Sequence, residues 1–205
     1  MNYEKLATKE TVSKTAEKLL ANNIEVFTVE NGAEALAKIK GLIPKGASVM
    51  NGSSRTLEQM GLVEYLKSGE HGWHNLHQTI INEKDKSKQK LLRKQAVLSD
   101  YYLGSVHALT ETGEFIIASN SGSQLPHVVF TSPNLIFVVS TKKIVPTLSD
   151  AMNRLHEHVI PLEEANMRQK YGVGTWPSKI LIFNRENPTS GRKVRMILVK
   201  ENLGF

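Results

Sequence analysis

One stretch of the 205-residue chain indicates the fold class, and it lies at residues 47–56: Ala47-Ser48-Val49-Met50-Asn51-Gly52-Ser53-Ser54-Arg55-Thr56. Its first four residues form a short apolar run that is typical of a buried strand. A polar, glycine-containing loop follows, and Thr56 and Gln59 have capping-box spacing for a new helix. The stretch therefore predicts a strand, a loop and a helix start, which is the repeating unit of an α/β fold.

The same alternation continues toward the amino end. Residues 11–22 carry apolar side chains at helical spacing, and residues 24–29 are rich in β-formers. Asn31 is suited to cap a further helix whose apolar face ends at Leu42. The residues before the first stretch thus predict helix, strand and helix in turn.

The second half of the chain predicts more strands, at residues 115–119, 135–140, 180–183 and 194–199, with a helix over 148–158. Alternating strands and helices favour a mainly parallel sheet with helices on both faces, in an α/β class. We expect a single domain over residues 1–205, with a polar, solvated excursion at about 69–95. Five strand residues are expected to be buried: Phe27, Val49, Ile117, Val138 and Ile197.

Composition excludes several kinds of chemistry. The chain has no cysteine, so it cannot itself hold a cysteine-ligated iron–sulfur cluster or zinc ion. The net charge is +6, but much of the basic charge falls in residues 84–94 instead of alternating with aromatic residues, which argues against nucleic acid. No run resembles a signal peptide or a membrane span, and we expect a cytoplasmic protein.

Ligands of open parallel sheets bind beyond the carboxyl ends of the strands, so polar loops there are the candidate site. We predict that one loop cluster supplies donors for a small carboxylate or phosphate. The predicted ligand-binding residues are Gly52, Ser53, Ser54, Arg55, Thr56, Thr112, Gly113, Ser121, Gly122 and Arg192. Loops 52–56, 111–113 and 121–122 should meet at one edge of the sheet, with Arg55 or Arg192 near Glu111.

Each loop also has a structural interpretation. Residues 110–113 have the composition of a hairpin turn, which we favour over a site for that segment alone. His71, His74 and His77 suggest a metal site, but Gly72 weakens a helix there and no nearby carboxylate completes a ligand set. The phosphate-loop, dinucleotide-binding, zinc-protease and serine-hydrolase motifs are all absent.

Three segments, in order, resemble the LUD (lactate utilisation, LutC-like) family: residues 46–62 with Gly-Ser-Ser-Arg-Thr-Leu-Glu, residues 106–145, and residues 177–199. The most specific is Ala108-Leu109-Thr110-Glu111-Thr112-Gly113, followed by a strand and a Ser/Gly-rich loop. The resemblance implies a fold like that of sugar-phosphate isomerases and coenzyme A transferases. It also implies a role in lactate oxidation to pyruvate beside iron–sulfur partner subunits, with no cofactor of the chain's own.

Two other functions stay open. Thr110-Glu111-Thr112-Gly113 resembles the segment that carries the nucleophilic glutamate of coenzyme A transferases, in which case Glu111 would form an acyl intermediate. A non-catalytic interaction module is the other alternative, with basic residues 84–94 docking an acidic partner in a salt-sensitive manner. A bound coenzyme A or nucleotide is left open by the sequence.

Overall fold

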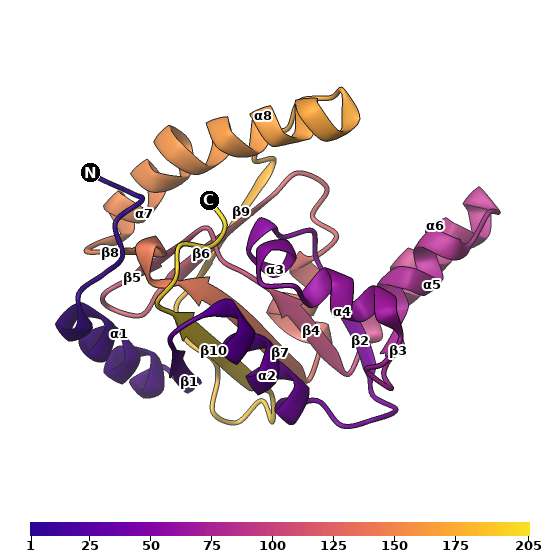
Figure 1. The fold of residues 1–205 in the computed structure, drawn as a ribbon, viewed down its shortest axis with the longest axis horizontal. Coiled ribbons are helices and arrows are strands. Elements are labelled where there is room, and N and C mark those ends of the chain that lie inside the picture. Colours follow the sequence, from indigo (N-terminus) through magenta and orange to yellow (C-terminus); the bar gives the residue numbers. More distant parts are fainter.

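The chain folds around a six-stranded parallel sheet, as shown by a computed structural model that describes residues 1–205 (Figure 1). The strand order is β1-β10-β7-β4-β2-β3, and every pairing in the sheet is parallel. The strands are β1 (Ile24–Val29), β2 (Ser48–Asn51), β3 (His74–Asn75), β4 (Tyr101–Gly104), β7 (Asn134–Ser140) and β10 (Lys193–Val199). All carboxyl ends therefore point toward one side of the molecule.

Helices connect these strands, and local sequence explains where the first of them begin. The Thr8 side chain accepts a hydrogen bond from the Thr11 amide, and the Asn31 side chain accepts one from the Glu34 amide, as N-caps do. The α-helices are α1 (Lys9–Ala21), α2 (Gly32–Leu42), α3 (Arg55–Gln59), α4 (Leu62–Ser68), α5 (Leu76–Asn82), α6 (Lys86–Gln95), α7 (Leu148–Arg154) and α8 (Ile160–Tyr171). Short 3-10 or π-helical turns are η1 (Ala96–Leu98), η2 (His127–Thr131), η3 (Thr141–Lys143) and η4 (Leu155–Val159).

Both faces of the parallel sheet are covered, as the near-continuous apolar runs of β7 and β10 require. Leu135, Phe137 and Val139 of β7 pack with α1 on one face. Ile136 and Val138 pack with α2, α3 and α4 on the other face. The mainly parallel sheet with helices on both faces, predicted from the sequence, is confirmed.

A second sheet was not predicted. It has four strands in the order β8-β5-β6-β9, and it packs against the same face of the parallel sheet as α1. The strands are β5 (Ala108–Thr110), β6 (Phe115–Ser119), β8 (Ile144–Val145) and β9 (Lys179–Phe183). Two of the expected strands, β6 and β9, therefore pair antiparallel with each other outside the main sheet. Helix α7 and η4 cover its other face through Ala151, Leu155 and Val159.

The segment between β2 and β4 contains β3, α4, α5 and α6, and Figure 1 shows α5 and α6 extending away from the sheet. Helix α6 has no buried residue. Of the five residues expected to be buried, Val49, Ile117, Val138 and Ile197 are buried. Phe27 is only half-buried, because β1 is an edge strand. The part of its ring that the sheet leaves uncovered lies under the Lys38 amine. None of the helices combines the length and the apolar character needed to cross a membrane.

Candidate functional site

A cavity of about 660 Å³ opens at the carboxyl ends of the parallel strands. The loops that follow β2, β4 and β6 line it, together with Lys143 at the end of η3. Helix α8 contributes Glu163, Asn166 and Met167, and Phe205 completes the wall. The cavity lies where ligands of open parallel sheets bind, which makes it the candidate site.

The loop after β2 lines the cavity over all five of the residues predicted for it, Gly52 to Thr56. Ser54, and not Thr56 as the sequence spacing suggested, is the N-cap of α3, with its side chain accepting from the Leu57 amide. Thr56 is buried within the first turn and its hydroxyl accepts a hydrogen bond from Lys143. Arg55 is exposed and forms a salt bridge with Glu58.

Gly52 is required for close packing and not for an unusual backbone angle. A Cβ atom at this position would lie 2.5 Å from the Tyr102 hydroxyl and 3.3 Å from a Gln124 side-chain oxygen. Tyr102 is buried and its ring stacks on His127, so it has no room to withdraw. The glycine therefore lets the loop after β2 approach the floor of the cavity.

Gly52→Ala is expected to lower the free energy of unfolding by roughly 1–3 kcal/mol, because the added methyl overlaps the buried Tyr102 hydroxyl. Urea denaturation measures the change. Gly41→Ala is the matched control: it lies in α2 with open space around it, and alanine there should be neutral or stabilising by up to about 1 kcal/mol. Equal effects for the two variants would contradict the packing explanation.

Lys143 is the most unusual residue of the cavity. Only 4% of it is exposed, and its amine donates to three neutral oxygens: the Thr56 hydroxyl at 2.9 Å, and the Ser105 hydroxyl and Val106 carbonyl at 3.2 Å. Gly204 passes directly over it, so closely that a Cβ there would overlap Thr56. Burial, assisted by the positive charges of Arg154 and Lys142, holds the pKa of Lys143 well below its usual range.

Of the three histidines that line the cavity, His107 and His127 are held in the neutral form. Burial lowers the pKa of His107 to about 3, with further contributions from the charges of Lys143 and Arg154. The His107 Nδ1 atom accepts a hydrogen bond from the Ala118 amide, which orients the ring. Burial lowers the pKa of His127 to about 4, and its Nδ1 atom lies 2.9 Å from the Ser132 hydroxyl.

The serine-rich loop after β6 forms another part of the wall. Ser121 lines the cavity, as predicted, with Asn120 and Ser123 on either side. Gly122 does not line it: this glycine has a φ of 82° and packs against the Lys179 side chain. The loops after β2 and β6 therefore converge, as the sequence analysis expected.

The third loop does not join them. Residues 110–114 form the turn of the β5–β6 hairpin, and this turn packs against α1 near Asn22, beside the amino end of β1. Glu111, Thr112 and Gly113 thus lie outside the cavity, on the far side of the sheet from the Gly52 loop. The expected convergence of three loops is corrected to two, because β5 and β6 belong to the second sheet.

Arg192 also lies away from the cavity. It precedes β10 at the amino end of the sheet, where its guanidinium donates to the carbonyl groups of Ser132, His127 and Val128. Its Nη1 atom lies 3.3 Å from the Glu186 carboxylate. This arginine holds the end of η2, and neither it nor Arg55 is positioned beside Glu111 as expected.

The three spaced histidines do not form a common site. His71 is buried and stacks on Trp73, whereas His74 is exposed on β3. His77 lines the cavity from α5, and burial lowers its pKa. No group of three or more histidine, aspartate or glutamate side chains is arranged to hold a metal ion.

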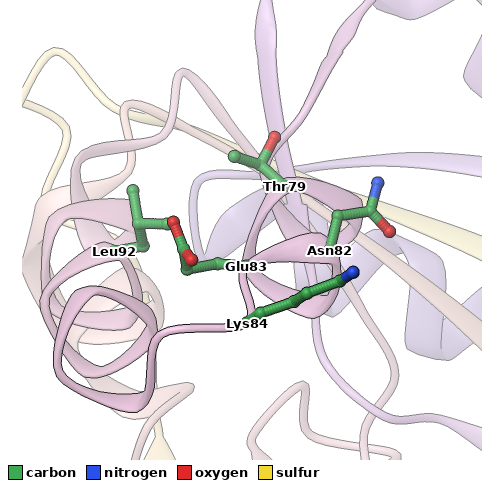
Figure 2. A pocket seen from close by; sticks show the side chains of 5 residues that line it. All are labelled: Thr79, Asn82, Glu83, Lys84 and Leu92. Atoms are coloured by element: carbon green, nitrogen blue, oxygen red, sulfur yellow. The ribbon is translucent and has the colours of Figure 1, made fainter.

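A second hollow lies near the turn between α5 and α6 (Figure 2). Its walls are Thr79, Asn82, Glu83, Lys84 and Leu92. Figure 2 shows Leu92 facing this turn from α6, and it is the one apolar side chain of the five. A hollow with so little apolar surface does not resemble a small-molecule site.

Lys143, His107, Tyr102 and His127 were missed by the sequence analysis. Lys142-Lys143 lies within three residues of the end of β7, and charged residues near the carboxyl end of a buried strand were the available signal. His107 follows β4, which the sequence analysis did not predict, so it was not placed at a strand end.

Comparison with known proteins agrees with this architecture. The sequence profile of the LUD domain matches residues 12–188, which is most of the chain. The chain belongs to the LUD domain family. This LUD domain is also similar in structure to a DUF162 family protein from Deinococcus radiodurans, with a TM-score of 0.57 and 14% identity over 95% of this chain and 99% of that one. A search of curated proteins found no match to this chain. The structural likeness supports the fold, and the profile supports the family.

Proposed function

We propose that this LUD domain binds a small metabolite carrying a carboxylate or phosphate in the cavity at the strand ends, as part of lactate utilisation. The observation that carries the proposal is Lys143, a buried lysine in the cavity wall whose amine has no carboxylate partner. A bound anion would give this amine the partner that the protein does not supply.

The rest of the lining supports an anionic ligand. Arg55 and Arg93 add positive charge, and Glu58 is neutralised by salt bridges to Arg55 and Lys170. Burial raises the pKa of Glu163, the other glutamate of the wall, and its carboxyl group accepts a hydrogen bond from Asn166. Hydroxyl donors are abundant around the cavity: Ser53, Ser54, Thr56, Ser105, Ser119, Ser121, Ser123 and Thr175.

The family is linked to lactate utilisation, which makes lactate and pyruvate the first ligands to consider and iron–sulfur oxidoreductase subunits the partners to expect. The chain has no cysteine, so electrons from lactate would pass to clusters on those partners. Acyl transfer by Glu111 is not favoured, because that carboxylate lies on the hairpin turn away from the cavity.

Isothermal titration calorimetry with lactate, pyruvate, a sugar phosphate and coenzyme A is expected to show saturable binding of at least one ligand. Lys143→Met should weaken that binding about tenfold or more, since the hydrogen bond from the amine to the ligand is lost. Lys86→Met, on the exposed face of α6, is the control and should bind as the natural sequence does. Absence of binding heat with all four ligands would overturn the binding role. Binding heat with the sugar phosphate alone would exclude lactate as the ligand.

A further inference from the structure

The charges around Lys143 leave its amine in an unusual position. It takes part in none of the salt bridges of the structure. The carboxylate that faces this cluster of cations, Glu4, lies 2.9 Å from Lys142 Nζ and 2.9 Å from His158 Nε2. Lys143 therefore has cations as its charged neighbours, and its three hydrogen-bond partners are neutral.

A further cation stands behind it. Arg154 is fully buried; its Nη1 atom donates to the His107 carbonyl, while its Nε and Nη2 atoms have no hydrogen-bond partner. Two buried cations, Lys142 and Arg154, thus act against a third charge on Lys143. Burial and these two neighbouring charges together hold the pKa of Lys143 well below its usual range, in the wall of a cavity that admits a small molecule.

We propose that Lys143 is a nucleophile that forms an imine with the carbonyl group of a small oxo acid, or of a phosphate ester bearing a ketone, bound in the cavity. The inference rests on the proposed function and names its substrate class more closely. A buried lysine amine flanked by other cations is the arrangement that activates lysine for attack on a carbonyl carbon. The ligand's own carboxylate or phosphate would be attracted by Arg154 and Lys142 behind the amine.

The covalent step balances without an added reagent. The lone pair of Lys143 Nζ attacks the carbonyl carbon, and the oxygen takes up a proton to give a carbinolamine. Loss of that oxygen as water, carrying both protons of the amine, leaves a carbon–nitrogen double bond. The hydroxyl groups of Thr56 and Ser105 lie against Nζ and are placed to relay these protons.

Reductive trapping tests the proposal. The natural chain is incubated with pyruvate or dihydroxyacetone phosphate plus sodium cyanoborohydride, which delivers hydride to the imine carbon and makes the bond permanent. Intact-mass spectrometry should show one adduct, and peptide mapping should place it on Lys143. Lactate, which has a hydroxyl in place of the ketone, should give no adduct under the same conditions.

Lys143→Arg is the matched variant, because it keeps the positive charge but cannot form an imine. It should lose the adduct while still binding the ligand in calorimetry. Binding heat with pyruvate or dihydroxyacetone phosphate but no adduct in the natural chain would overturn the imine and leave the proposed binding function intact. An adduct spread over surface lysines, unchanged in Lys143→Arg, would overturn it as well, and absence of binding heat with every ligand would overturn both.

A readout on the natural chain covers the case in which Lys143→Arg does not fold. The natural chain is treated with an amine-reactive reagent at pH 7 and at pH 9. Peptide mapping then measures how much the labelling of Lys143 and of Lys86 increases between the two pH values. Because burial lowers the pKa of Lys143, its labelling should gain less from the higher pH than the labelling of exposed Lys86 on α6. Equal gains at the two positions would contradict the proposal.

Discussion

Replacing Val138 with aspartate is expected to leave the chain unfolded under conditions in which the natural sequence is folded. Val138 is fully buried in β7, between β10 and β4, and packs in the cluster formed with α2, α3 and α4. A carboxylate placed there would be removed from water and surrounded by apolar side chains, with no cation to pair with. The cost, about 5 kcal/mol or more, is comparable with the whole stability of an ordinary domain.

Circular dichroism and thermal melting measure this outcome. Val138→Ala removes the same packing without adding a charge, and should cost only roughly 2 kcal/mol while keeping a cooperative transition. Val129→Asp introduces the same carboxylate at a half-exposed position of η2 and should change stability by about 0.5 kcal/mol or less. A melting curve for Val138→Asp like that of the natural chain would contradict the placement of β7 in the core.

Arg192→Met is expected to lower the free energy of unfolding by about 3–5 kcal/mol without weakening ligand binding. Glu186 and Arg192 are both nearly buried, with side-chain exposures of 6% and 11%, so removal of the cation leaves a buried, unpaired carboxylate. The three carbonyl groups at the end of η2 lose their donor as well. Denaturant unfolding and calorimetry together separate this structural role from the ligand-binding role that the sequence suggested.

Two controls sharpen the comparison. Glu186→Leu combined with Arg192→Met removes both charges, and should be more stable than the single variant, since replacing a buried pair with apolar side chains is often neutral. Lys67→Met breaks the exposed pair with Glu64 and should cost about 0.5 kcal/mol or less. A loss of ligand affinity in Arg192→Met, at unchanged stability, would indicate that Arg192 takes part in ligand binding.

The sequence predicted the local elements well where apolar periodicity was strong. The strand at Ile24–Val29 has the bounds that were expected, and Asn31 caps α2 as predicted. Strand β4 was missed, since Tyr101–Gly104 is short and ends in a glycine, and α8 was missed because it has no buried residue and no clear apolar face. Weak periodicity leaves a helix or strand without a local signal.

Which strands pair was decided by the tertiary structure. The β-forming residues of Phe115–Ser119 predict a strand, but they do not specify which strands pair with it. Pairing of β6 with β9 placed the hairpin turn against α1, and so moved Glu111 and Thr112 away from the Gly52 loop. The sequence of residues 110–113 therefore carried no information about the distance of this segment from the cavity.

By itself, the sequence determined an α/β fold with a parallel sheet and a polar loop at Gly52–Thr56, because apolar runs and cap residues act within a few positions of one another. Only the tertiary structure decided the character of Lys143. Arg154 of α7 and Gly204 near the carboxyl end reach η3 from distant parts of the chain, and they supply a neighbouring positive charge and cover for the Lys143 amine. A pKa depends on desolvation and on charges within a few ångströms, and both are set by long-range packing that no local pattern encodes.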